Sequence, residues 1–150
     1  MGLTQQDLAD VTTENAVTVG QKLYAQYGIT GIRGQVEAGL PVVLHHGLPV
    51  LETGLKLGYD INRAGCAALL EILVHSTDTN IIARSSRERQ LAWVARVKEL
   101  LAQTPYPDEE ALVELDDQFI AENLSPGGSA DLLALTYLLH FFKTEEHLHV

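Results

Sequence analysis

Residues 123–131 read Asn123-Leu-Ser-Pro-Gly-Gly-Ser-Ala-Asp131, and they lead directly into Leu132-Leu-Ala-Leu-Thr-Tyr-Leu-Leu-His-Phe-Phe142. Apolar side chains surround nearly the whole of a helix with this second sequence, which predicts that the helix is buried. Ser125 is suited to be the N-cap of this helix, and Pro126 is suited to be its first residue. The negative charge of Asp131 is favourable near the positive end of the helix dipole. The free N–H groups of such an end favour an anion, although a well-capped helix explains the same residues.

The rest of the chain also has helical periodicity, and we find no strand pattern or internal repeat. A second nearly all-apolar helix is expected over residues 61–75, capped by Asp60. Further helices are expected over residues 4–9, 17–27, 41–57 (kinked or broken at Pro49), 87–103 (inward stripe Leu91, Val94, Val97 and Leu101) and 108–122. The short segment 32–39 contains two glycines, and on a helix its Arg33 and Glu37 would share one face. The prediction is an all-α fold, a compact multi-helix bundle with two nearly all-apolar central helices. The chain is expected to comprise a single helical domain over residues 1–142 and a polar tail over residues 143–150.

Composition narrows the classes of function. The chain has 150 residues and a formal net charge of −10, which argues against binding to nucleic acid or to an anionic membrane surface. No uninterrupted apolar run is long enough to span a membrane, and residues 1–5 do not resemble a signal peptide. Cys66 is the single cysteine, so no internal disulfide is possible. We therefore expect a cytoplasmic protein.

Three polar stretches interrupt the apolar helices, namely residues 33–37, 76–84 and 125–131. We expect them to meet in one internal pocket. Together they supply two arginines, three carboxylates, glycine-rich turns and serine hydroxyls: Arg33, Arg84, Glu37, Asp78, Asp131, Ser125 and Ser129. This set suits a phosphate-bearing ligand held with Mg²⁺. His75 and Asp78 are also spaced to share a metal ion, although a histidine beside a capping aspartate is the commoner arrangement, and the adjacent His45 and His46 make a poor chelate.

At these stretches the chain resembles the C-terminal half of the triphosphoribosyl-dephospho-CoA synthase family, also called ATP:dephospho-CoA triphosphoribosyl transferase. The resemblance is carried by residues 123–136, by Gly31-Ile-Arg-Gly-Gln-Val-Glu-Ala-Gly-Leu-Pro41 and by Asp78-Thr-Asn80. Gln35 stands where the family usually has glutamate, and Ser85-Ser86 where it has two glycines. The family's N-terminal half, with its Pro-Gly-Leu-Val, Gly-x-His-x-Asp-Met and Asn-Thr-His-Lys-Gly segments, is absent, so we expect a fragment or one part of a split protein.

The resemblance implies transfer of the 5-triphosphoribosyl group of ATP to the 2′-hydroxyl of 3′-dephospho-CoA, with release of adenine. The product is the prosthetic-group precursor of the acyl-carrier protein of citrate lyase or malonate decarboxylase. By analogy with glycoside chemistry, Asp78 or Glu37 is expected to be the base or to stabilise the oxocarbenium-like transition state. Asp78 and Asp131 are the expected Mg²⁺ ligands. The expected nucleotide- and phosphate-binding residues are Arg33, Gly34, Thr79, Asn80, Arg84, Ser125, Gly127, Gly128 and Ser129.

Two alternatives remain open from the sequence. Instead of being an enzyme or half of one, the chain could be a nucleotide- or coenzyme-binding helical module that is inactive without the missing N-terminal half, or a purely structural helical domain. If a partner half normally packs on this one, an apolar patch should be exposed, and self-association as a dimer would bury it.

Overall fold

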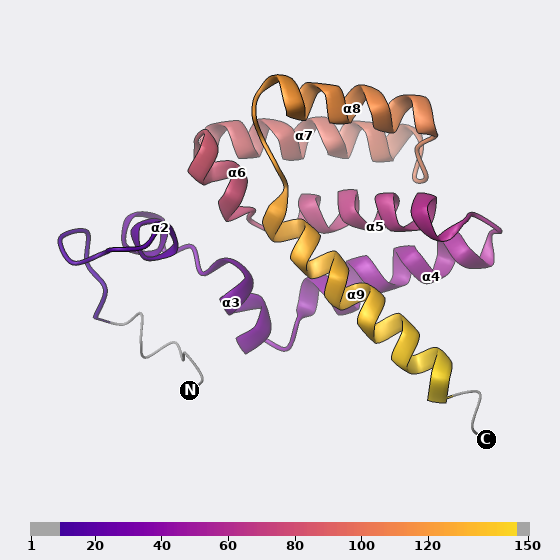
Figure 1. The fold of residues 1–150 in the computed structure, drawn as a ribbon, viewed down its shortest axis with the longest axis horizontal. Helices are drawn as coiled ribbons and strands as arrows, with labels where there is room; N and C mark the ends of the chain where they lie inside the picture. Colours follow the sequence, from indigo (N-terminus) through magenta and orange to yellow (C-terminus); the bar gives the residue numbers. More distant parts are fainter. Residues whose placement is uncertain (1–9, 147–150) are drawn as a thin grey trace.

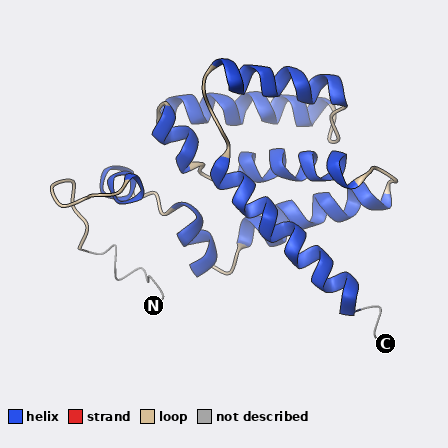
Figure 2. Cartoon of the chain, in the orientation of Figure 1, coloured by secondary structure: helices blue, strands red, loops and turns tan. Residues whose placement is uncertain are grey.

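The computed structural model describes residues 10–146, and every regular element in that range is a helix (Figures 1 and 2). In chain order these are α2 (Val19–Tyr27), α3 (Gly31–Glu37), the π-helical turn η1 (Val43–Gly47), α4 (Leu48–Lys56), α5 (Ile61–His75), α6 (Thr79–Arg84), α7 (Arg87–Gln103), α8 (Glu109–Ala121) and α9 (Gly127–Glu146). The predicted all-α fold is confirmed. The short helix expected over residues 4–9 lies outside the described residues.

Helix α5 lies at the centre of the bundle, between α4 and α7 (Figure 1). Its N-cap is Asp60, whose carboxylate accepts from the backbone N–H groups of Asn62 (2.9 Å) and Arg63 (3.0 Å). Buried side chains of α5 enter all three apolar clusters of the core: Leu70 and Leu73 pack with α7 and α8, Ile72 packs with η1 and α9, and Ala64 and Ala68 pack with α4. The apolar sequence of α5 is therefore matched by neighbours on several sides.

Two glycines allow the helices around α5 to approach closely. A Cβ on Gly47 of η1 would lie 2.8 Å from Ile72 Cδ1 and 2.7 Å from Thr136 Oγ1. A Cβ on Gly65 of α5 would lie 2.8 Å from Tyr137 Cζ, on a ring whose hydroxyl donates to the carbonyl of Ile61 (3.2 Å). Carbon contacts this short are not tolerated in a packed interior, so these crossings require glycine.

Pro49 does not break the helical backbone, and the irregularity beside it is a π-helical turn. The backbone is helical from residue 41 to residue 56, with the π-helical turn η1 directly before Pro49. Proline has no N–H and its ring crowds the preceding turn of an α-helix. A wider π turn accommodates both effects without ending the helix.

Helix α9 is less buried than its composition predicts. Leu132, Ser129 and Thr136 are buried, but Leu138, Phe141 and Phe142 are 50%, 53% and 59% exposed. These last three residues, spaced at i, i+3 and i+4, share one side of the helix and are called here the α9 apolar face. Figure 1 shows α9 crossing α5 and α4 and projecting beyond them at its C-terminal end.

The ends of α9 also differ from the expectation. The helix begins at Gly127, and the carbonyl of Pro126 accepts its first backbone hydrogen bond from Ala130 (2.9 Å), so Pro126 rather than Ser125 takes the N-cap position. At the other end α9 continues to Glu146, into the predicted polar tail. Residues 147–150 lie outside the described residues.

The predicted inward stripe of α7 is found in part: Val97 is buried, Val94 and Leu101 are half-buried, and Leu91 is not buried. Gln90, Trp93 and Val97 are its buried residues, and Leu91 is 55% exposed. The reason is tertiary: the Trp93 ring stacks on Phe119 of α8 at a centroid distance of 4.2 Å, which turns that face inward. Among residues 10–146 no helix combines the length and the apolar character needed to cross a bilayer.

Candidate functional site

The buried carboxylate of Asp78 joins the start of α6 to the start of α9. Its Oδ1 accepts from the backbone N–H groups of Asn80 (3.0 Å) and Ile81 (3.3 Å), which makes Asp78 the N-cap of α6. Its Oδ2 accepts from the backbone N–H and from the hydroxyl of Ser129, both at 2.8 Å. Asp78 is 1% exposed and Ser129 is 0% exposed. One negative charge therefore serves the positive ends of two helices that are far apart in sequence.

A polar pocket of about 220 Å³ lies beside this carboxylate. Three segments line it: Gly28, Ile29, Thr30, Gly31, Ile32 and Gln35 around the α2–α3 turn; Ser76, Thr77 and Thr79 around the α5–α6 loop; and Gly128 and Leu132 of α9. The structure thus brings together parts of all three polar stretches. The lining offers hydroxyl groups, one side-chain amide and glycine backbone, but no charged side chain.

Glycines keep the walls of the pocket close to one another. A Cβ on Gly31, whose φ is +57°, would lie 3.1 Å from Cγ2 of Thr79. A Cβ on Gly127 would lie 2.6 Å from Nδ2 of Asn80. The first contact joins the α2–α3 turn to α6 and the second joins α6 to α9. Of these residues, Gly31 and Thr79 line the pocket, and the contact between Asn80 and Gly127 lies outside its lining.

Several predicted residues lie outside the lining of this pocket. Arg33 is partly buried and Glu37 is exposed on α3, while the neighbouring Gln35 reaches the pocket and its Oε1 accepts from the N–H of Val42 (3.2 Å). Arg84 is exposed, and its guanidinium donates to the carbonyl of Asn123 at 3.4 Å.

Ser125 and Cys66 line a second, apolar cavity of about 410 Å³ between α5 and α8. Burial raises the pKa of the Cys66 thiol, which keeps it protonated at neutral pH and makes it a weak nucleophile. Ser125 is not among the residues that line the polar pocket, whereas Gly128 is.

The contacts of Asp78 do not fit a role as a magnesium ligand. Its two oxygens accept four hydrogen bonds, which uses the lone-pair positions that a metal ion would need. Asp131 is exposed. The contacts favour a positioning role for Asp78, which holds Thr79 and Gly128 at the pocket.

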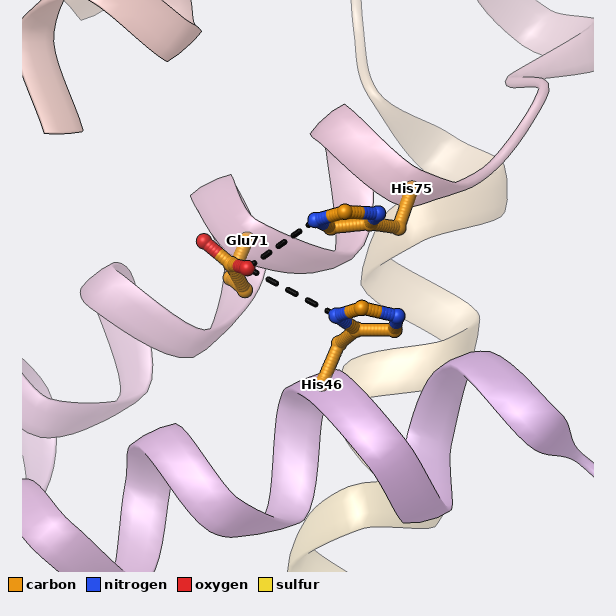
Figure 3. A group of neighbouring side chains, drawn as sticks. All are labelled: His46, Glu71 and His75. Carbon is orange, nitrogen blue, oxygen red and sulfur yellow. Dashed lines mark ion pairs between the residues drawn. The ribbon is translucent and has the colours of Figure 1, made fainter. Parts of the chain in front are cut away.

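The part of the chain that the structure describes contains one group of three or more histidine, cysteine or acidic side chains whose ligand atoms all lie within 4.8 Å of one another. It consists of His46, Glu71 and His75 (Figure 3). The sequence pattern did not predict this cluster. His46 reaches α5 only because η1 and α5 pack together, and the i, i+4 spacing of Glu71 and His75 was the one local signal.

Comparison with known proteins identifies the family. The family model described as CitG, ATP:dephospho-CoA triphosphoribosyl transferase, matches residues 1–149. The chain belongs to this family. The resemblance found in residues 31–41, 78–80 and 123–136 is therefore confirmed, and the family is one of transferases.

Two curated relatives show how much of the family protein the chain represents. The 2-(5''-triphosphoribosyl)-3'-dephosphocoenzyme-A synthase of Pectobacterium atrosepticum is 42% identical over 134 residues, which are 89% of this chain and 44% of the relative. A probable synthase of the same name from Pectobacterium carotovorum subsp. carotovorum is 41% identical with the same coverage. The chain thus spans less than half the length of these relatives. No solved structure matches it.

Proposed function

We propose that this chain provides one wall of the active site of a triphosphoribosyl-dephospho-CoA synthase. The reaction joins ribose C1 of ATP to the 2′-hydroxyl oxygen of 3′-dephospho-CoA, breaks the bond from C1 to adenine, and passes the hydroxyl proton to a base. The product would serve the acyl-carrier protein of citrate lyase or of malonate decarboxylase. The observation that carries the proposal is the single pocket that three family-matched segments form.

The size and chemistry of the pocket support a partial site. Pockets that hold a whole small ligand usually measure about 300–1,000 Å³, whereas this one measures about 220 Å³. Hydroxyl and backbone donors around Thr79 and Gly128 suit ribose hydroxyls or phosphate oxygens. Because no lining side chain is charged, the charge that balances a triphosphate would come from Arg33, Arg84 or the remainder of the family sequence.

The roles proposed for the carboxylates follow from their contacts. Asp78 is a positioning residue because its oxygens are committed to two helix starts. Glu37 is exposed on α3, and no hydrogen bond or ion pair joins its carboxylate to another side chain among residues 10–146, so it is the candidate base within this chain. Mg²⁺ would bind together with ATP, and Asp78 would not be one of its ligands.

Adenine release measured by chromatography, with Mg²⁺, ATP and 3′-dephospho-CoA, tests this proposal. The family's N-terminal segment should be supplied on a separate polypeptide. Release that needs both polypeptides and falls at least about a hundredfold with Glu37→Gln supports the assignment. Undiminished release in that variant would remove Glu37 from the mechanism. ATP binding by calorimetry without release in any combination would instead favour the alternative, a nucleotide-binding module.

The α9 apolar face, Leu138, Phe141 and Phe142, is the surface that we expect the assembled enzyme to cover. Two occupants remain open: the rest of the family sequence and a second copy of this chain. Sedimentation at increasing concentration, alone and with the N-terminal segment, distinguishes them. Phe142→Ser should weaken either association. The control is Val113→Ser, at a similarly exposed apolar residue of α8, which should leave both associations unchanged. Equal behaviour of the two variants would exclude the α9 apolar face as the interface.

A further inference from the structure

We propose that His46, Glu71 and His75 form a binding site for a divalent transition-metal ion, of which Zn²⁺ is the representative. Figure 3 shows the three side chains facing one another across the boundary between η1 and α5. Glu71 Oε1 lies 3.1 Å from His75 Nε2 and 3.6 Å from His46 Nδ1. This site is separate from the polar pocket and does not depend on the proposed transferase function.

The distances suit a small tetrahedral ion. Bonds of about 2.0–2.1 Å to nitrogen and oxygen place the ligand atoms of tetrahedral zinc roughly 3.3 Å apart. The two distances from Glu71 lie close to that value on either side. All three ligand atoms lie within 4.8 Å of one another. Rotation of the side chains can therefore bring the two histidine nitrogens to the separation that a shared ion needs.

The type of ligand decides the class of metal. Two imidazole nitrogens and one carboxylate oxygen favour zinc, cobalt, nickel, copper or ferrous iron over magnesium or calcium, which prefer oxygen ligands. Three protein ligands leave a fourth position for water, which is the pattern of reactive zinc sites. The side chains of His46 and His75 are 33% and 36% exposed, so an ion has direct access.

The surrounding backbone supports a positive charge here. His75 is the last residue of α5, where the free carbonyl groups carry the negative end of the helix dipole. His46 lies in a π-helical turn, an irregularity that often accompanies a functional site. A metal ion would therefore bind across two elements whose packing already brings the ligands together.

Without a metal, the two imidazole rings stack with centroids 3.6 Å apart and planes inclined by 13°. The lone pairs of parallel rings do not point at a common atom. Binding therefore requires the rings to turn about their Cβ–Cγ bonds, and their exposure leaves room for this motion. We expect the ion to replace the stack and to tie η1 to α5.

Cobalt titration tests the site directly, because Co²⁺ in a four-coordinate nitrogen–oxygen site absorbs visible light. The protein should carry no purification tag, and His147 and His149 should be changed to alanine, since a His-x-His segment binds metals by itself. In this background we expect one Co²⁺ per chain, displaced by Zn²⁺ but not by excess Mg²⁺, and a higher melting temperature with the ion. His46→Ala, His75→Ala and Glu71→Gln should each weaken binding by at least about tenfold.

His45→Ala is the matched control, because His45 is the exposed neighbour of His46 and lies outside the cluster. It should bind Co²⁺ as the parent does. Circular dichroism of each variant at equal concentration should show the helix content of the parent, so that a loss of metal binding is not caused by unfolding. Absence of stoichiometric binding in the parent, or an equal loss in His45→Ala and His46→Ala, would overturn the proposal.

Discussion

Substituting Asp78 by asparagine tests the central contact of the structure. The amide oxygen can still accept from Asn80 and Ile81, but the amide nitrogen then faces the N–H of Ser129, a donor facing a donor. A buried N–H left without a partner costs about 1–3 kcal/mol, and a hydrogen bond to a neutral group is worth roughly 1 kcal/mol less than one to a charged group. We therefore expect Asp78→Asn to lower the free energy of unfolding by about 3 kcal/mol.

Urea unfolding at neutral pH measures this loss. Helix content by circular dichroism should report the whole molecule, and fluorescence of the single tryptophan, Trp93, reports the core around α7 and α8. Ser129→Ala removes one of the two donors to Oδ2 and should cost about 1–2 kcal/mol.

Asp60→Asn is the matched control, because Asp60 also caps a helix through two backbone N–H groups but is exposed. It should cost less than Asp78→Asn, since water replaces a lost partner at the surface. A stability of Asp78→Asn within about 0.5 kcal/mol of the parent, or a larger loss in Asp60→Asn, would refute the shared-cap reasoning. Activity measurements on Asp78 variants need this stability correction before any rate is interpreted.

Two further predictions concern the contacts of α9. Gly65→Ala should destabilise by about 1–3 kcal/mol, because its Cβ would collide with Tyr137, whereas Gly20→Ala, open on α2, should be neutral or stabilising; equal unfolding midpoints would contradict this. The hydrogen bond from Lys143 is the main cause that holds the pKa of Glu52 below its usual value of 4.5. A pKa lowered by folding adds stability at pH values above the unfolded-state pKa, and this stability is lost as the pH falls through the folded-state pKa. Glu52→Gln should therefore be less stable than the parent at pH 7 by urea unfolding, and the difference should shrink as the pH falls below 4.5, the usual pKa; a difference that does not shrink with falling pH would show another cause.

The helix boundaries were the features most accessible from sequence, because their causes are local. Gly28 ends α2 with a φ of +68°, and Ser86 caps α7 by accepting from the N–H of Arg89 at 3.1 Å. Both residues were predicted to do so from their immediate neighbours. Pro49 shows the limit of the same reasoning, since whether a proline breaks a helix or produces a π turn depends on how firmly the flanking turns are packed.

The candidate site was likewise predictable from sequence only in part. The polar stretches were recognised, and Thr79 and Gly128 do line one pocket, but Arg33, Glu37 and Ser125 do not join them there. A stretch of sequence identifies polar residues without showing which of them point inward, because that depends on the rotation of each helix against its neighbours. Gln35 reaches the pocket whereas Glu37, two positions later on the same helix, is exposed.

The sequence by itself determined the helical class, the buried central helix α5 and the family, because periodicity, caps and motifs are written in residues close to one another. Only the tertiary structure decided that Asp78 binds Ser129, 51 residues away, and that His46 meets Glu71 and His75. It also decided that the apolar helix beginning at Gly127 keeps one face exposed. The physical reason is that hydrogen bonds and burial between distant segments depend on the angle and rotation at which the helices pack, and no local pattern specifies either.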